Sequence, residues 1–189
     1  MPKAARPKGV SVHQLKVTLL GVEPPVWRRL LVAPETKLSE LHHILQAVME
    51  WENDHLHDFT IDGRRYGGSA RTPWEDSSDE ARTRLSRVVR GIGAKFRYTY
   101  DFGDSWEHEI VVEDMIPAQE GVRYPICVAG ERAGPPEDVG GAWGYSDFLQ
   151  AIGDPEHPDH EDMLCWVGGS FDPEAFDIEQ VNKLLRKVR

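Results

Sequence analysis

The segment from Phe96 to Val112 constrains the fold most, because bulky apolar residues alternate with polar ones on both sides of a single short turn. Side chains two positions apart lie on the same face of a β-strand. The alternation therefore predicts an antiparallel hairpin with one aromatic face against the core. The residues of that face are Phe96, Tyr98, Tyr100 and Phe102 in the first strand and Trp106, His108, Ile110 and Val112 in the second.

The length of the turn decides which residues of the hairpin face each other. A three-residue loop over residues 103–105 places Phe102 opposite Trp106 and sets apolar side chains against apolar ones. A two-residue loop would place Tyr100 opposite Glu107, which either buries a carboxylate or exposes a ring. We therefore predict the three-residue loop. Its further pairs are Tyr100 with His108, Tyr98 with Ile110, Phe96 with Val112, Asp101 with Glu107 and Thr99 with Glu109.

The N-terminal part of the chain predicts a second hairpin. Residues 12–20 and 26–32 alternate like strands, and the segment between them holds a glycine and two prolines, which break a strand. Arg28 and Arg29 lie on opposite faces of the second strand. One of the two must therefore lie along an apolar surface, and we expect its charge to reach water.

A helix is predicted from Leu38 to Met49, where apolar residues recur at helical spacing, with Thr36 as the expected N-cap. The helix contains the adjacent histidines His42 and His43. Neighbouring side chains in a helix diverge by about 100 degrees, so these two cannot easily share one metal ion.

A second histidine pair, His55 and His57, lies two positions apart on an expected strand over residues 55–61. Such spacing suits a metal pair. The two histidines continue the face of Phe59 and Ile61, however, so a buried and hydrogen-bonded role is favoured.

The charge of the chain is unevenly distributed. The net charge is -10, which argues against a domain dominated by nucleic-acid binding. Nine Lys/Arg and four Asp/Glu occur from Arg64 to Arg97, whereas two Lys/Arg and twenty Asp/Glu occur from Asp101 to Glu179. We expect these opposite charges to pair within the fold. The alternative is a phosphate-binding stripe on a short helix, made by Arg82, Arg84, Arg87 and Arg90.

The termini and the cysteines bound the class of protein. Residues 1–10 predict a disordered basic tail before a single α+β domain over residues 11–189. No stretch approaches the ~20 apolar residues of a membrane span, so we expect a cytoplasmic protein without a membrane partner. Cys127 and Cys165 are far apart and are expected to be free buried thiols. No cofactor is predicted.

A long irregular segment, residues 118–144, follows the aromatic hairpin. Two prolines, two carboxylates and two glycines occur in succession in residues 135–141, which predicts a stiff approach and a sharp turn that holds Glu137 and Asp138 between them. These carboxylates could cap backbone amides, which is the favoured reading, or bind a cation. Three short helices are then expected over residues 147–152, 158–166 and 178–188, the first capped by Ser146 and the last by Asp177.

Several motifs, in this order along the chain, resemble the open-reading-frame-three-like family named from a Ri plasmid, which is also labelled as insertion-sequence passenger TnpR-like. They are Pro24-Pro25-Val26-Trp27-Arg28-Arg29, Leu41-His42, His55-Leu56-His57-Asp58-Phe59, Tyr98-Thr99-Tyr100-Asp101-Phe102-Gly103-Asp104-Ser105-Trp106-Glu107-His108, and Pro135-Pro136-Glu137-Asp138-Val139-Gly140-Gly141 with Gly144-Tyr145.

The resemblance implies an α+β domain with a ubiquitin-like hairpin-helix start, an extended and mostly antiparallel sheet, the central aromatic hairpin and short C-terminal helices. It implies a mobile-element or plasmid-associated protein and brings no established activity. The transposon label suggests a resolvase, but the chain shows no resolvase nucleophile setting. Many family members carry cysteines near the Pro-Pro-Glu-Asp loop, where this chain has Ala133 and Val139, so a thiolate metal site is not implied.

Three functional hypotheses follow, in order of preference. The first is a binding or adaptor module, in which an exposed Trp106 or Trp143 beside acidic residues contacts a basic or apolar segment of a partner protein. The second is a nucleic-acid accessory factor that uses the four arginines and the basic tail. The third is a divalent-metal-dependent hydrolase whose hairpin carboxylates hold Mg²⁺ or Mn²⁺, with His108 or the pair His55 and His57 as the base.

The residues singled out fall into two sets. The candidate functional surface consists of Asp101, Asp104, Glu107, Glu109, Glu137 and Asp138. The residues with an expected structural role are Trp27, Tyr100, Phe102, Trp106 and His108.

Overall fold

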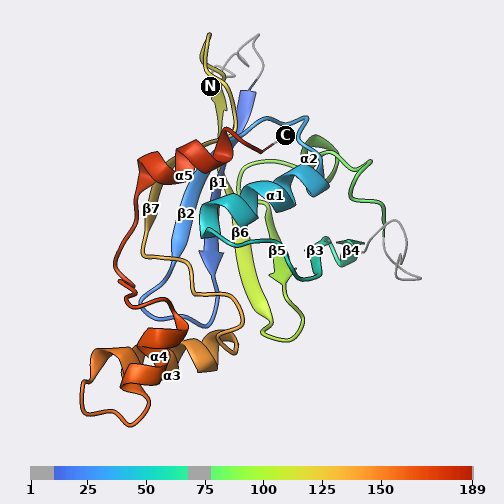
Figure 1. Ribbon diagram of the computed structural model, residues 1–189. Coiled ribbons are helices and arrows are strands. Elements are labelled where there is room, and N and C mark those ends of the chain that lie inside the picture. Colours follow the sequence, from blue (N-terminus) through green and yellow to red (C-terminus); the bar gives the residue numbers. More distant parts are fainter. Residues whose placement is uncertain (1–10, 68–77, 189) are drawn as a thin grey trace.

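A seven-stranded antiparallel sheet forms the framework of the computed structural model, which describes residues 11–67 and 78–188 (Figure 1). The strands lie in the order β4-β3-β5-β6-β1-β2-β7. The expected tail over residues 1–10 lies outside the described residues. The strand bounds are β1 Ser11–Leu19, β2 Trp27–Val32, β3 His57–Ile61, β4 Arg64–Gly67, β5 Lys95–Tyr100, β6 Trp106–Pro117 and β7 Ile126–Glu131.

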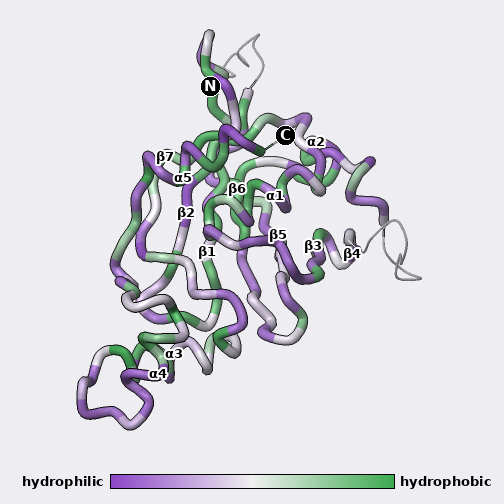
Figure 2. Tube along the Cα trace, in the orientation of Figure 1, coloured by the Kyte–Doolittle hydropathy of each residue, from purple (hydrophilic) through white to green (hydrophobic). Residues whose placement is uncertain are grey.

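Five helices accompany the sheet in the described part of the chain, so the α+β class is confirmed. Their bounds are α1 Leu38–Met49, α2 Leu85–Val88, α3 Gly141–Gly153, α4 His160–Trp166 and α5 Ile178–Leu185. Helices α1 and α5 contact each other and cover the same face of the sheet, whereas α3 and α4 pack together below one end of it (Figure 1). The hydrophilic residues between α3 and α4 stand out in Figure 2. The hairpin of β1 and β2, followed by α1, is the predicted ubiquitin-like start.

The start of α1 differs by one residue from the prediction. Lys37, rather than Thr36, is the N-cap, and its backbone N–H donates to the Glu40 carboxylate at 2.9 Å. Thr36 lies just before the helix, where its backbone carbonyl accepts a hydrogen bond from the backbone N–H of Leu85 at 2.8 Å. The short helix α2, expected to carry four arginines, begins at Leu85 and includes only Arg87 of the four.

The central hairpin has the predicted faces and a different register. Tyr100 pairs with Trp106, Tyr98 with His108 and Phe96 with Ile110, so the three-residue loop was wrong and the loop spans residues 101–105. The cause lies at Asp101, which leaves the strand with φ 52°. Its backbone N–H donates to the Leu56 carbonyl at 2.9 Å, and its carboxylate accepts from the Gly103 N–H at 2.9 Å.

The new register removes one residue from the expected aromatic face. Phe102 lies in the loop and is 41% exposed, so its predicted place in the core was wrong. A shift of two residues keeps every other side chain on its face. Tyr100, Trp106 and His108 are accordingly buried as predicted.

The segment over residues 118–144 is more regular than predicted. It contains β7, an edge strand that pairs with β2, and the first residues of α3. Helix α3 begins at Gly141, and Ser146 lies inside it rather than at its cap. At the last helix the prediction was right, because the Asp177 side chain accepts from the backbone N–H groups of Glu179 and Gln180.

Arg28 is the largest departure from the sequence expectation in the core. It is completely buried, and its guanidinium does not reach water. Its Nε donates to the Val48 carbonyl at 2.8 Å, and its Nη1 donates to the carbonyls of Trp27 at 2.9 Å and Glu131 at 2.8 Å. The guanidinium also lies 4.5 Å from the centre of the Phe176 ring. Burial lowers the pKa of Arg28 to about 10.

The two cysteines differ from each other. Cys127 is free and buried, as expected, whereas Cys165 is free and exposed. The burial predicted for Cys165 was therefore wrong, because α4 has no buried residue.

Replacing Arg28 with Met is expected to destabilise the protein by about 3 kcal/mol or more, because the change leaves three carbonyl groups, that of the buried Val48 among them, without their donor. Urea unfolding followed by circular dichroism measures the loss. Arg29→Met, in the same strand, is the control. It removes a partly exposed pair with Glu113 and is expected to cost about 1 kcal/mol. Equal losses in the two variants would contradict the assignment.

Candidate functional site

Three segments meet at the end of the sheet that carries the hairpin tip. They are residues 51–55 after α1, the hairpin loop 101–105 and the loop 132–140 before α3. The Trp51 indole donates to the Pro135 carbonyl at 2.8 Å, and the backbone N–H of Glu52 donates to the Glu137 carboxylate at 2.7 Å. These bonds fasten the acidic loop to the end of α1.

Tyr100 joins the same three segments from below. Its hydroxyl donates to Glu137 at 2.5 Å and accepts from the backbone N–H of Asp54 at 3.1 Å. Burial, and after it the hydrogen bond to Glu137, raises the pKa of Tyr100. Tyr100 therefore remains a neutral donor, and Glu137 is held by two hydrogen bonds rather than left free.

His55 lies between two of the predicted acidic residues. Its Nδ1 is 3.8 Å from a carboxylate oxygen of Asp101, and its Nε2 is 3.1 Å from one of Asp138. Asp101 is 8% exposed, whereas the Asp138 side chain is 71% exposed. The ligand atoms of these three residues all lie within 4.8 Å of one another. We call His55, Asp101 and Asp138 the tip cluster.

Asp104 links the hairpin tip to α3. Its carboxylate accepts from the Gly140 backbone N–H at 3.1 Å. A Cβ at Gly141, where φ is +68°, would lie 2.3 Å from the Asp104 carbonyl oxygen. Only glycine can bring its backbone this close to Asp104. This contact explains Gly141, the second of the two glycines that follow Glu137 and Asp138.

The four hairpin carboxylates do not form one cluster, which corrects the sequence expectation. The register places Glu107 opposite Thr99 instead of Asp101, and Glu109 opposite Arg97 instead of Thr99. Glu107 then forms an ion pair with Arg97 at 2.6 Å, and Glu109 with Lys95 at 3.4 Å. Asp101, Asp104, Glu137 and Asp138 gather at the tip, and Glu107 and Glu109 remain on the strand.

The two histidines of the 55–57 segment separate. His57 turns toward α1, where its ring stacks on that of His42 at 3.5 Å between centroids, and its Nε2 lies 2.9 Å from the Glu80 carboxylate. His55 alone joins the tip cluster. The pairing of His55 with His57 as a metal site or as a base therefore does not form.

A buried polar network supports the site from the core side. Gln46 donates to the Tyr98 hydroxyl at 3.0 Å, so that hydroxyl is left to donate to Nδ1 of His42 at 2.7 Å. Nε2 of His42 then carries the proton and donates to Asn53 at 2.6 Å. Burial, and after it the neighbouring His57, lowers the pKa of His42 from 6.5 to about 3. Burial likewise lowers the pKa of His108 to about 4, which makes it a core residue rather than a base.

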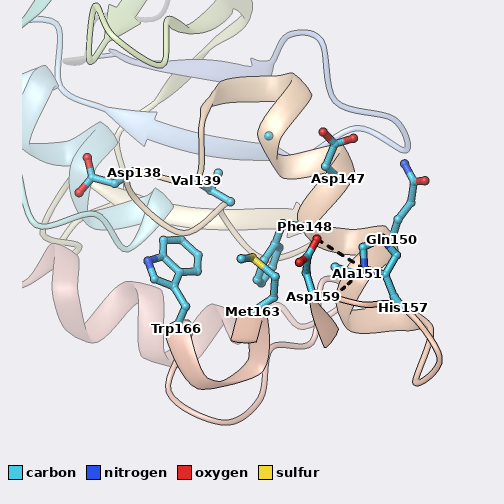
Figure 3. Close-up of a pocket in the computed structure, with 11 residues that line it drawn as sticks. Asp138, Val139, Asp147, Phe148, Gln150, Ala151, His157, Asp159, Met163 and Trp166 are labelled. Atoms are coloured by element: carbon cyan, nitrogen blue, oxygen red, sulfur yellow. Dashed lines mark hydrogen bonds and ion pairs between the residues drawn. The ribbon is translucent and has the colours of Figure 1, made fainter. Parts of the chain in front are cut away.

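A cavity of about 510 Å³ opens between α3 and α4, next to the tip cluster (Figure 3). Figure 3 shows Phe148, Met163 and Trp166 together along its apolar side. The rings of Phe148 and Trp166 lie 5.7 Å apart, edge to face. Its rim carries three carboxylates, those of Asp138, Asp147 and Asp159. We call this space the helix cavity.

Sequence reasoning missed the helix cavity, although its elements were expected. The helical segments 147–152 and 158–166 were predicted, but no pattern in them showed that they pack against each other. The available signal was the density of acidic residues beside exposed tryptophans. Of the two tryptophans expected to be exposed, Trp106 is buried and Trp143 is 87% exposed.

The remaining predicted residues lie away from the tip. Trp27 is half-buried, and its indole donates to Glu131 at 2.9 Å. Three of the four arginines of the proposed stripe pair with carboxylates: Arg82 with Asp79, Arg84 with Glu35 and Arg90 with Asp62. These pairs agree with the expectation that opposite charges meet within the fold. They leave less charge for phosphate groups than the sequence indicated.

Comparison with known proteins places this fold and these motifs in a family. The family described as "Plasmid pRiA4b ORF-3-like protein" matches residues 11–180. This range includes the hairpin tip, the acidic loop and the helix cavity. The chain belongs to this family. Its relatives include "Uncharacterized protein y4hQ" of Sinorhizobium fredii (strain NBRC 101917 / NGR234), which is 45% identical over 177 residues, 92% of this chain and 90% of the relative.

A solved structure of similar shape comes from an archaeon. The crystal structure of the "Protein of Unknown Function MM3350 from Methanosarcina mazei Go1" superposes with a TM-score of 0.83 at 38% identity. The match covers 91% of this chain and 98% of that one. The two folds thus agree over nearly the whole of both chains. Among the helices of the described residues, none is long and apolar enough to span a membrane.

The neutral, buried histidines predict a pH dependence of stability. The unfolded chain takes up a proton at His42 and His108 near pH 6.5, and the folded chain does so only near pH 3 and pH 4. Between these values the unfolded state binds more protons, so the free energy of unfolding falls as the pH falls. We expect a loss of about 1 kcal/mol per pH unit from each histidine between about pH 6 and about pH 5.

Urea unfolding at several pH values, followed by circular dichroism, measures this slope. His42→Gln is expected to reduce the slope by the contribution of one histidine, about 1 kcal/mol per pH unit. His43→Gln, on the exposed face of the same helix, is the control. A slope unchanged by His42→Gln would show that the ring takes up its proton as readily in the folded protein as in the unfolded chain.

Proposed function

We propose that this plasmid pRiA4b ORF-3-like protein is a binding module that holds a segment of a partner protein in the helix cavity. The segment has a bulky apolar side chain beside arginine or lysine. The observation that carries the proposal is the composition of the cavity, which joins an apolar side to an acidic rim.

The apolar side supplies an anchoring position. Trp166 belongs to a residue type that often dominates binding energy at protein interfaces. Met163 is a flexible side chain that adapts to different binding partners. A volume of about 510 Å³ accommodates one or two side chains rather than a folded domain. A single apolar residue of an extended or helical segment therefore fits the space.

The acidic rim determines which side chains of the bound segment are favoured next to the apolar anchor. Asp138, Asp147 and Asp159 line the cavity, and they belong to a region with two Lys/Arg and twenty Asp/Glu between Asp101 and Glu179. Such a field attracts cationic partners and speeds their encounter. A basic segment matches it, whereas an acidic segment is repelled.

Trp143 extends the same surface beyond the cavity. It precedes Gly144, which lines the cavity, and it is 87% exposed. A tryptophan with so much exposed area has little structural role in the isolated chain. An indole also stacks on guanidinium groups, which adds to the preference for arginine.

Fluorescence anisotropy with labelled peptides tests the proposal. A short peptide with one leucine between two arginines is expected to bind in low salt and to weaken as salt is added. Two matched peptides, one with glutamates in place of the arginines and one with alanine in place of the leucine, are expected to bind at least about tenfold more weakly.

Protein variants locate the site. Asp147→Asn combined with Asp159→Asn, and separately Trp166→Ala, are expected to weaken the arginine–leucine peptide at least about tenfold. Glu156→Gln combined with Glu161→Gln removes the same charge from the same acidic region without touching the cavity lining and is expected to change little. Equal binding of the glutamate peptide, equal effects of the two double variants, or no binding by any peptide would each overturn the proposal.

A further inference from the structure

We infer that the tip cluster, His55 with Asp101 and Asp138, is a binding site for one first-row divalent cation of the zinc or manganese class. The site requires no partner segment, and it shares a single residue, Asp138, with the helix cavity. It rests on the convergence of three donors from three separate parts of the chain.

Each donor is brought to the site by a different element. His55 precedes β3, Asp101 begins the hairpin loop, and Asp138 lies in the acidic loop. The Asp101 backbone N–H bonded to the Leu56 carbonyl fixes the first two relative to each other. Glu137, bonded to Tyr100 and to the Glu52 backbone, fixes the loop that carries Asp138. The surrounding fold therefore holds the segments that carry the donors, in addition to the contacts that His55 makes with the two carboxylates.

Asp101 gives the inference its electrostatic basis. A carboxylate that is 8% exposed needs a compensating positive charge or several donors. Among the ion pairs of the described residues, neither Asp101 nor Asp138 has a Lys or Arg partner, and both face His55. An imidazole is positive only when protonated. A cation at this position supplies the permanent charge that the two carboxylates lack.

The donor set indicates the class of cation. One imidazole nitrogen and two carboxylate oxygens suit zinc and manganese, whereas magnesium prefers oxygen ligands and retains most of its water. Three protein ligands also leave a coordination position for water, as in zinc sites that are not purely structural.

The present separations require a small adjustment. Metal–ligand bonds of about 2.1 Å place neighbouring tetrahedral ligands about 3.4 Å apart, and the donors here lie within 4.8 Å of one another. Asp138 can close this difference, because its side chain is 71% exposed and is therefore little confined by packing. Asp101 stays in place, since its carboxylate also accepts the Gly103 N–H at 2.9 Å.

Isothermal titration calorimetry with zinc chloride tests the site on tag-free, full-length protein. Cys165→Ser serves as the background, because an exposed thiol binds zinc by itself. One equivalent is expected to bind. Titration with cobalt chloride is expected to give visible absorption that reports the coordination geometry, and magnesium chloride is expected to bind far more weakly.

Substitutions then assign the ligands. His55→Ala and Asp138→Asn are each expected to weaken zinc binding at least about tenfold, and both positions are exposed enough to leave the fold intact, which circular dichroism checks. Asp101→Asn is expected to do the same. His157→Ala, which removes a histidine beside Asp159, is the matched control and is expected to leave zinc affinity unchanged.

The outcomes separate this inference from the proposed function. Zinc binding that survives both His55→Ala and Asp138→Asn, or no saturable binding by the background protein, overturns the metal site. Asp147→Asn with Asp159→Asn is expected to leave zinc binding intact while it weakens peptide binding. His55→Ala is expected to leave peptide binding intact, so either idea can fail without the other.

Discussion

The buried guanidinium of Arg28 is the interaction on which the rest of the structure depends. Its three carbonyl partners belong to β2, to α1 and to the last residue of β7. Phe176, from the segment before α5, lies over it. One side chain thus joins the helical layer to the edge of the sheet. Because the acidic loop begins directly after Glu131, this same contact sets where that loop leaves the sheet and where it can meet the hairpin tip.

A second polar assembly holds the other side of the site. Tyr98, in β5, connects Gln46 and His42 of α1, and His42 in turn reaches Asn53. Buried networks of this kind carry a high cost when one member is lost, because every other member then lacks its partner. The segment that carries His55 follows Asn53 directly, so its course is fixed by hydrogen bonds rather than by apolar packing alone.

Periodicity in the sequence was sufficient to predict which side chains share a face of a strand. It was insufficient to predict the register between the strands. Tyr100, Trp106 and His108 are buried as the alternation requires, and a slip of two residues preserves that alternation. What decided the register was the left-handed conformation of Asp101, which no hydrophobic pattern encodes. Strand β7 escaped prediction for a related reason: it is an edge strand whose register with β2 shifts between Arg29 and Leu30, and β2 lies about a hundred residues earlier in the chain.

The sequence predicted which types of residue form the candidate site, but it did not predict which individual residues come together there. The acidic pair after the two prolines and the aspartates of the hairpin loop do meet, whereas Glu107 and Glu109 find cross-strand cations. His55 joined the site and His57 did not, although both stand in one short motif. That choice depends on His42 stacking against His57, a contact between segments that the sequence alone does not relate.

Asp138 borders both the tip cluster and the helix cavity. A carboxylate that coordinates a cation has less negative charge to offer a basic side chain, so a cation and a cationic segment would compete for the same group. Thermodynamic linkage makes that antagonism reciprocal, with each ligand weakening the other by the same factor. If both proposed sites are occupied in this way, a single exposed aspartate lets the local concentration of a metal ion set how readily the proposed basic segment enters the helix cavity.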